Sequence, residues 1–393
     1  MYDFDEIIDR RHSNSMKWGG ASKRLTPAQC AADPLPMWVA DMDFRVAPEI
    51  TDALRRELDR GVYGYGGTPD SYVEAVLDWQ RRRFGWVAKP EWLLQSPGVV
   101  NSLNMAIQAF SQPGDYVVVQ SPVYIHFHYD VLINGRRLIQ APLINESGHY
   151  RFDAKAFEAA LLPGTKLFIL SNPHNPTGNV WTREELLQMS AICARRGIVV
   201  ISDEVHQDLV FGNDQTHIPF ASISEEAEQN SVVCIAPSKT FNVAGLQCAN
   251  VLIANPLLRV AFRAQCERAG INLTNIMGTA ACEAAYRYGE AWADQMLSYV
   301  GANQRHFADR IKALGLPLIV TPTSALYLAW IDFRALCMPA TELHDYLLRV
   351  ARLWLDPGTK FGNGGEGFMR INLACPRVYV DEAISRLTAA LTR

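Results

Sequence analysis

Short apolar runs alternate with amphipathic stretches through the middle of the chain, from about residue 93 to residue 255. The runs are continuously hydrophobic rather than alternating between apolar and polar, which is typical of strands covered on both faces in a mainly parallel sheet. We therefore predict an α/β fold whose central sheet contains strands at residues 116–119, 167–170, 198–201, 232–235 and 251–254.

Helical periodicity flanks this central region. One helix is predicted to begin at Pro48, because Ile50, Leu54 and Leu58 fall on one face, and to end at Gly61. Further patterns predict helices at residues 69–83, 291–314 and 341–352 and from residue 380 onward, and strands at residues 325–331 and 368–373.

Together these patterns predict three parts. Residues 1–45 are irregular and rich in Trp, Pro and Asp, so we expect an N-terminal arm that packs with a small domain. Residues 46–288 form the large domain with the central sheet, and residues 289–393 form the smaller α+β domain. No linker-like composition separates the two domains, so the boundary rests on the change of pattern alone.

Three polar motifs follow predicted strands directly. They are Asn-Pro-His-Asn-Pro-Thr-Gly at 172–178, Ser-Asp-Glu-Val-His at 202–206 and Ser-Lys-Thr-Phe-Asn at 238–242. Ligands of parallel sheets bind beyond the carboxyl ends of the strands. The sequence therefore predicts that the amide of Asn175, the carboxylate of Asp203 and the amine of Lys239 meet in one crevice.

This combination suits pyridoxal 5'-phosphate. A partly desolvated Lys239 would spend time unprotonated and could bond to the aldehyde of the cofactor. Asp203 could keep the pyridine nitrogen protonated, which makes the ring an electron sink, and Asn175 could donate to the phenolic oxygen. Taken alone, each residue is better explained in another way: Lys239 as a surface cation, Asp203 as a helix N-cap and Asn175 as a turn former. Their joint occurrence predicts a pyridoxal phosphate site in which Lys239 and Asp203 are catalytic.

The phosphate group of such a cofactor needs hydrogen-bond donors, and residues 96–102 offer them. This turn precedes an apolar-periodic stretch, which predicts a helix whose first free N–H groups, at Val99 and Val100, bind an anion. Ser238 adds a hydroxyl group beside Lys239. The alternative for residues 96–102 is a plain loop with a Ser or Asn cap.

The three motifs resemble those of fold-type I pyridoxal phosphate enzymes, the aspartate aminotransferase superfamily. The resemblance runs from about residue 4 to the C-terminus and implies a PLP-dependent transferase-like fold. The chain is also similar to one branch, the MalY/PatB-type C–S lyases (cystathionine β-lyases), in Lys17-Trp18, residues 36–44, Tyr63-Gly64-Tyr65 and His206, where ordinary aminotransferases carry a Tyr.

The resemblance implies roles for further residues. Tyr124 would stack on the pyridine ring and join the catalytic residues, Arg370 would bind the α-carboxylate of the substrate together with Asn175, and Ala40 would contact the substrate. His206 would touch the edge of the ring or pack behind it, and we assign it no proton. For Tyr124 a core position, and for Arg370 a solvent-facing position, remain alternatives.

The chain departs from the aminotransferase pattern near the expected phosphate. Ala236 stands where a Ser is common, and Gln247 stands where an Arg often binds the phosphate. The resemblance implies that Tyr63 of a second subunit reaches this group, so we expect a homodimer with composite sites. Aromatic packing in a Gly-rich turn is the alternative for Tyr63.

The resemblance favours a carbon–sulfur β-lyase that cleaves cystathionine or related cysteine S-conjugates to a thiol, pyruvate and ammonia. A class I/II aminotransferase would use the same residues, and a pyridoxal phosphate-binding regulator that contacts another protein is a further alternative. The substrate would be a small amino acid in each catalytic case.

Composition and charge argue against several other classes of protein. The net charge of −4 and the dispersed Lys and Arg residues give no reason to expect a nucleic-acid partner. No apolar stretch approaches the ~18 residues of a membrane span, and no signal peptide is visible. The eight cysteines have neither pair nor ligand spacing, so we expect free thiols, no metal site and a cytoplasmic protein.

Overall fold

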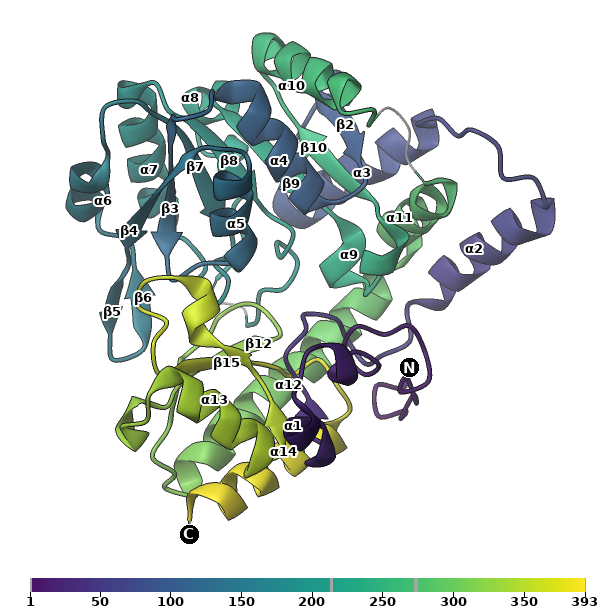
Figure 1. The fold of residues 1–393 in the computed structure, drawn as a ribbon. Coiled ribbons are helices and arrows are strands. Elements are labelled where there is room, and N and C mark those ends of the chain that lie inside the picture. Colours follow the sequence, from purple (N-terminus) through teal and green to yellow (C-terminus); the bar gives the residue numbers. More distant parts are fainter. Residues whose placement is uncertain (1, 213–214, 272–274, 393) are drawn as a thin grey trace.

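The structure is a computed structural model that describes residues 2–212, 215–271 and 275–392. Within these residues, a mixed sheet of seven strands forms the centre of the larger part of the molecule (Figure 1). Its strands, in spatial order, are β2 (Leu93–Ser96), β10 (Ala249–Leu252), β9 (Ser231–Ile235), β8 (Val199–Asp203), β7 (Thr165–Ser171), β3 (Tyr116–Ser121) and β4 (Arg137–Pro142).

The strands from β9 to β4 are parallel, which confirms the predicted mainly parallel sheet. Strand β10 runs antiparallel to both of its neighbours, and it lies two residues earlier than predicted. Strands β2 and β4 were not predicted. Both lie at edges of the sheet and are only partly buried, so their sequences lack a continuous apolar run.

Helices cover both faces of the sheet, as the apolar runs require. Val117 and Val119 of β3 pack toward α4 (Val99–Phe110), α5 (Ile125–Ile133) and α10 (Pro256–Arg268). Val118 points to the opposite face, where α6 (Ala154–Ala160) and α7 (Arg183–Arg196) contribute Phe157 and Leu186. Alternate side chains of one strand therefore enter two separate cores.

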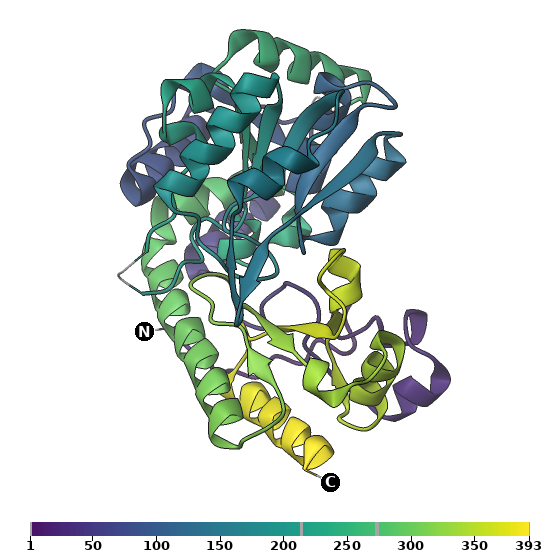
Figure 2. The ribbon, with the colours of Figure 1, turned by 90° about the vertical axis from the view of Figure 1, so that its left-hand side faces the viewer.

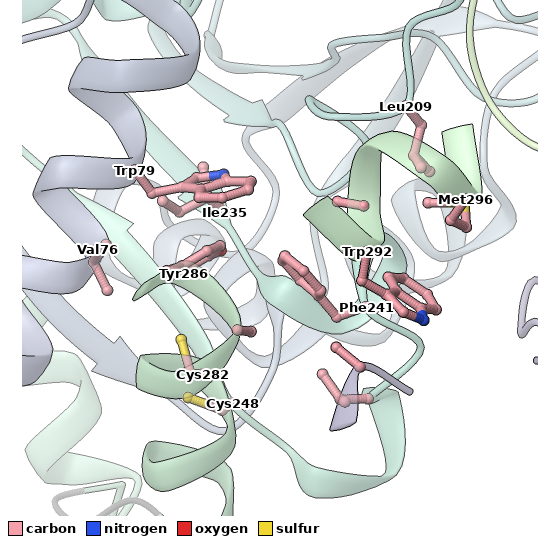
Figure 3. Packing of buried hydrophobic residues seen from close by; sticks show 14 of the residues in the cluster. Val76, Trp79, Leu209, Ile235, Phe241, Cys248, Cys282, Tyr286, Trp292 and Met296 are labelled. Carbon is pink, nitrogen blue, oxygen red and sulfur yellow. The ribbon is translucent and has the colours of Figure 1, made fainter. Parts of the chain in front are cut away.

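Three more helices pack beside the β2 edge of the sheet. Helix α2 (Pro48–Arg60) ends at Gly61, whose φ of 67° lies in the left-handed region, so the predicted start and stop are confirmed. Helices α3 (Asp70–Phe84) and α11 (Ile276–Tyr288) enclose an aromatic cluster, in which Trp79 stacks on Tyr286 (Figure 3).

The smaller part contains an antiparallel sheet and three helices. The sheet has the order β11 (Ile319–Val320), β12 (Leu328–Asp332), β15 (Phe368–Asn372) and β14 (Asp356–Pro357). It packs on α13 (Ala340–Arg349), α14 (Arg377–Leu391) and the end of α12 (Glu290–Ala313). Figure 2 shows α12 running along the side of both parts, and its side chains enter the core of each.

Three predicted boundaries in this part were wrong. Strand β12 begins three residues late because Leu326 has a φ of 73°, which is incompatible with an extended strand. Helix α13 ends early, before Arg352, whose φ of 54° is left-handed. Helix α14 begins three residues earlier than predicted, directly after Pro376.

Residues 2–45 contact both parts (Figure 1). Leu35 and Met37 enter the core of the smaller part, whereas Phe4, Met42 and Phe44 join the cluster of the larger part. They contain a short helix, α1 (Pro27–Ala31), and a short strand, β1 (Leu35–Pro36), which pairs with β13 (Leu353–Trp354). Neither element was predicted. The remaining elements are β5 (Ile144–Glu146), β6 (His149–Arg151), α8 (Glu225–Gln229) and α9 (Pro237–Thr240).

Candidate active site

A cavity of about 200 Å³ lies beyond the carboxyl ends of β7, β8 and β9. This is the position at which parallel sheets bind their ligands. Among the predicted site residues, all except Arg370 and Tyr63 line it: Ala40, Val99, Val100, Tyr124, Asn175, Asp203, His206, Ser238 and Lys239. The sequence motifs therefore meet in space as the strand-end argument requires.

Lys239 is carried by the short helix α9, and its Nζ donates a hydrogen bond to the Ala40 carbonyl oxygen at 2.8 Å. Burial and the nearby Arg370 lower the pKa of this amine to about 8, although Asp41 and Asp203 oppose the change. The unprotonated fraction of the amine near neutral pH is therefore far larger than for an ordinary lysine, although the ammonium form still predominates, and this suits a base or a nucleophile.

Two contacts fix helix α9. The Thr240 hydroxyl group donates to Asp208 at 2.8 Å, and the indole N–H of Trp79 donates to the other oxygen of the same carboxylate at 3.0 Å. Phe241, just beyond the helix, stacks on Trp292 in the cluster shown in Figure 3. The backbone that carries Lys239 is thereby anchored to the core on both of its sides.

Asp203 ends strand β8 and is buried. Its Oδ1 accepts a hydrogen bond from the Val205 N–H at 3.1 Å, and no Lys or Arg of the described residues forms an ion pair with it. Burial raises the pKa of this carboxyl group from 3.8 to about 7, although the Val205 N–H and Lys239 lower it. A cationic donor supplied by a ligand in the cavity would compensate this cost of burial.

Arg370, in strand β15, lies beside the cavity and is buried. Its Nη1 donates to Asn175 Oδ1 at 3.0 Å, and its Nη2 donates to Asp356 Oδ2 at 2.8 Å. Nη2 also approaches the Trp38 carbonyl oxygen at 3.3 Å, while Nε is buried without a partner among the described residues. The guanidinium group is therefore held in place and keeps a free donor. The solvent-facing alternative for Arg370 was wrong.

His206 and Tyr124 are both uncharged near neutral pH. Burial, Lys239 and Arg370 lower the pKa of His206 well below its usual value, so the imidazole ring stays neutral. Burial raises the pKa of Tyr124 to about 12, which keeps its hydroxyl group protonated. Neither group is poised to act as a base near neutral pH, and both are suited to packing and hydrogen bonding.

The opposite end of the cavity is formed by the start of helix α4. Gly98 precedes this helix and offers no side-chain cap, so the first backbone N–H groups of the helix are left for a ligand. Gln247 also lines the cavity, at the position where the sequence lacks an Arg. Among the described lining residues, Lys239 is the only cation, because His206 stays neutral.

Tyr63 lies elsewhere in the molecule. Its side chain is exposed, with 59% of its surface accessible, and its hydroxyl group donates to the Leu58 carbonyl oxygen at 3.2 Å. Within one chain it does not reach the cavity.

Sequence reasoning also missed residues that bear on the site. Asp356 pairs with Arg370, Tyr327 donates to the Ala40 carbonyl oxygen at 3.0 Å, and Ser171 and Cys248 line the cavity. Asp356 and Tyr327 come from short or irregular segments without a motif, so no sequence signal marked them. Ser171 directly precedes the motif at 172–178 and could have been included. All eight cysteines are free, as predicted.

The described residues contain no helix with the length and hydropathy of a membrane span. They also contain no cluster of His, Cys, Asp and Glu side chains arranged to hold a metal ion.

Comparison with known proteins gives consistent matches along the chain. A model of the family described as aminotransferase class I and II matches residues 35–387. Cystathionine β-lyase PatB of Bacillus subtilis (strain 168) is 42% identical over 393 residues, which cover 99% of this chain and 100% of that protein. Protein MalY of Escherichia coli (strain K12) is 31% identical over 394 residues, which cover 100% of this chain and 99% of that protein.

Among solved structures, the PLP-bound C–S lyase from Staphylococcus hominis has a TM-score of 0.92 and is 30% identical. The match covers 100% of this chain and 99% of that chain. The similarity therefore extends to both parts of the molecule and to the arm.

Proposed function

This chain belongs to the aminotransferase class I and II family, and we propose that it is a pyridoxal phosphate-dependent carbon–sulfur β-lyase. Its substrates would be cystathionine or related cysteine S-conjugates, and its products a thiol, pyruvate and ammonia. The observation that carries the proposal is that Lys239 and Asp203 line one cavity, in a chain that is 42% identical to a cystathionine β-lyase over 393 residues.

The donor set of the cavity fits pyridoxal phosphate. Asp203 is a buried carboxylate without a bonded cation, which a protonated pyridine nitrogen would supply. The start of α4 and the Ser238 hydroxyl group would hold the phosphate group, and Lys239 would bond to the aldehyde. Asn175 and Tyr124 would hold the ring by a hydrogen bond and by packing.

When bound, pyridoxal phosphate supplies an electron sink that allows the Cα–H bond and then the Cβ–S bond of the substrate to break. Arg370, which lies beside the cavity, would bind the α-carboxylate, with Asn175 next to it. The Lys239 amine takes the proton from Cα, which its lowered pKa permits near neutral pH. Asp203 holds the proton at the pyridine nitrogen. The Lys239 ammonium group would give its proton to the leaving thiolate, and one molecule of water is consumed as pyruvate and ammonia form.

The product mixture tests this function. The purified protein is incubated with cystathionine, and separately with an amino acid and a 2-oxo acid. We expect pyruvate, ammonia and a free thiol in the first reaction and little new amino acid in the second. Rapid formation of a new amino acid without thiol release would identify an aminotransferase instead. Lys239→Ala should abolish both reactions, whereas a regulator acting by protein contact could keep its effect.

We also propose that the working unit is a homodimer with composite sites. Lys239 is the only cation among the described lining residues, so a phosphate dianion has little charge compensation within one chain. Tyr63 lies on an exposed segment with Val62 and Tyr65, of which Tyr65 is 97% exposed. A two-fold axis would bring Tyr63 of each subunit to the site of the other, because such interfaces are reciprocal.

A further inference from the structure

The Ala40 carbonyl oxygen accepts two hydrogen bonds from buried groups. One comes from Lys239 Nζ at 2.8 Å, and the other comes from the Tyr327 hydroxyl group at 3.0 Å. Tyr327 does not line the cavity, and only 1% of its surface is accessible. It therefore reaches the Lys239 amine indirectly, through an acceptor that both donors share.

The Tyr327 side chain is held in place by its backbone. Leu326, the preceding residue, has a φ of 73°, a conformation that a bulky residue adopts only where the surrounding structure imposes it. The Leu326 N–H donates to the Leu209 carbonyl oxygen at 2.7 Å, and the Leu373 N–H donates to the Tyr327 carbonyl oxygen at 2.8 Å. These contacts impose the conformation and aim the hydroxyl group at Ala40.

The acceptor is equally fixed. It belongs to residues 39–44, which we call the strap. Asn372 Nδ2 donates to the carbonyl oxygens of Val39 and Asp41, both at 2.6 Å, on either side of Ala40. Asn242, three residues after Lys239, bonds to both the N–H and the carbonyl oxygen of Met42. The strap therefore cannot shift without disturbing the segment that carries the lysine.

We propose that Tyr327 is a positioning residue for Lys239, which acts through the shared Ala40 carbonyl group. It fixes the place of the amine whenever the amine is not bonded to the cofactor. Because a carbonyl oxygen that serves two donors holds each less strongly, Tyr327 also limits how firmly Ala40 retains the ammonium form. The position of the amine is argued from these contacts alone, and only its use as a base rests on the proposed function.

Other charged groups also face Lys239. Arg370 lowers the pKa of the amine together with burial, while Asp41 and Asp203 raise it. His206 is neutral, and Tyr124 is protonated near neutral pH. The Tyr327 ring contacts His206, and its hydroxyl group lies near Asp41 and Arg370. Tyr327→Phe keeps the ring and removes only the hydroxyl group, so it is the least disturbing test.

The test is the titration of Lys239 in the full chain freed of cofactor. The rate at which an amine-selective reagent labels Lys239 is measured against pH by mass spectrometry of its peptide. In Tyr327→Phe, Ala40 keeps Lys239 as its one donor, so we expect the pKa of Lys239 to rise by about half a unit. Labelling near neutral pH should then slow about threefold. Tyr150→Phe is the matched control, because it removes a buried hydroxyl group that bonds to Trp330 and Asn145, away from the cavity.

A second variant should change the pKa of Lys239 in the opposite direction. Asn372→Ala releases the strap, so the ammonium form loses its acceptor and the pKa of Lys239 should fall. An unchanged or lowered pKa in Tyr327→Phe would overturn the proposal, as would an unchanged or raised pKa in Asn372→Ala. Asn372→Ala tests the Ala40 carbonyl group as the acceptor, and Tyr327→Phe tests the hydroxyl group that shares this acceptor.

In the enzyme with its cofactor, the pH profile of kcat gives an independent reading. We expect the rising limb of the profile to move to higher pH in Tyr327→Phe, with KM within about twofold, since Arg370 is untouched. If thiol release is absent in the wild type, the proposed function fails while the labelling result still stands. If thiol release occurs and the titration of Lys239 does not move, only the role of Tyr327 fails.

Discussion

Burial acts in opposite directions on the two ionisable residues at the centre of the site. It raises the pKa of the Asp203 carboxyl group to about 7 and lowers the pKa of the Lys239 amine to about 8. In both cases the charged form is destabilised, because the cavity offers neither side chain a bonded partner of opposite charge among the described residues. A ligand in the cavity can therefore supply the group that each residue lacks: a cationic donor for Asp203 and a bonding partner for Lys239.

The role of Asp203 at the pyridine nitrogen can be tested by activity. Asp203→Asn is nearly isosteric, so the fold should persist, but the amide cannot hold the ring proton. We expect turnover to fall by several orders of magnitude. A variant within about tenfold of the wild type, a barrier change of only ~1.4 kcal/mol, would show that Asp203 is not the partner of the pyridine nitrogen.

The same substitution makes a prediction for the protein freed of cofactor. The Asp203 carboxyl group titrates at 3.8 when it is unperturbed and at about 7 in the fold, so the folded state binds more protons between these values. The free energy of unfolding should therefore decrease as the pH rises through this window. Asp203→Asn lacks this decrease, so its stability relative to wild type should increase from pH 4 to pH 8, by at most about 4 kcal/mol.

Urea unfolding at the two pH values measures this difference. Asp59→Asn, which changes an exposed carboxyl group on α2, is the control and should show no comparable trend. A stability difference for Asp203→Asn that is equal at pH 4 and pH 8 would contradict the proposed cost of burial.

Arg370 gives a prediction for substrate binding. A Lys at this position keeps the charge but loses the paired contacts to Asn175 and Asp356, so the α-carboxylate should be held less well. We expect Arg370→Lys to raise KM for the amino acid by about tenfold or more, a cost of ~1.4 kcal/mol. Arg349→Lys, an exposed arginine paired with Asp345, should leave KM unchanged. Equal KM values for the two variants would remove Arg370 from the substrate site.

Among the elements, the strands that could be predicted from the sequence are those buried on both faces, because burial requires a continuous apolar run. The runs at 116–119 and 167–170 lie in strands buried on both faces, and the motifs at their ends meet in one cavity. Strands β2 and β4 were not predicted, because strands at the edge of a sheet need no continuous apolar run. Tyr327 was missed because it bonds to Ala40, far away in the sequence. Asp356 was missed because its bond to Arg370 depends on the pairing of β14 with β15, which no motif marks.

Within the arm, a buried ion pair joins Lys17 to the strap, residues 39–44. Lys17 Nζ lies 2.6 Å from Asp43 Oδ2, and both side chains are nearly inaccessible. Lys17→Met leaves the Asp43 charge with Arg10 and the Trp18 indole N–H as partners. We expect a loss of about 3 kcal/mol in the free energy of unfolding, measured in urea. Lys166→Met, at an exposed lysine, should change stability by less than about 0.5 kcal/mol, and an equal effect of both would refute this role of the pair.

At the scale of the whole molecule, the two parts share helix α12, whose side chains enter both cores. The division into residues 1–45, 46–288 and 289–393 remains a prediction, and so does the cytoplasmic location. The exposed aromatic side chains of Tyr63 and Tyr65, in contrast, belong to no core of the single chain. They are the feature that the proposed homodimer would explain.

Hybrid dimers test the composite site. Lys239→Ala and Tyr63→Phe subunits should each be strongly impaired alone. Mixed after mild dissociation, they should recover part of the activity, because one site of each hybrid holds both intact residues. A fully active monomer in sedimentation at assay concentrations would contradict the composite site and require another phosphate donor.

The most direct measurement of the central claim is to locate the bond between protein and cofactor. The purified protein is reduced with borohydride, which makes the attachment permanent, then digested and analysed by mass spectrometry. We expect a single modified peptide, with the pyridoxal group on Lys239, and none in Lys239→Ala. A modification at another lysine, or a wild-type protein that binds pyridoxal phosphate without any modified peptide, would contradict it.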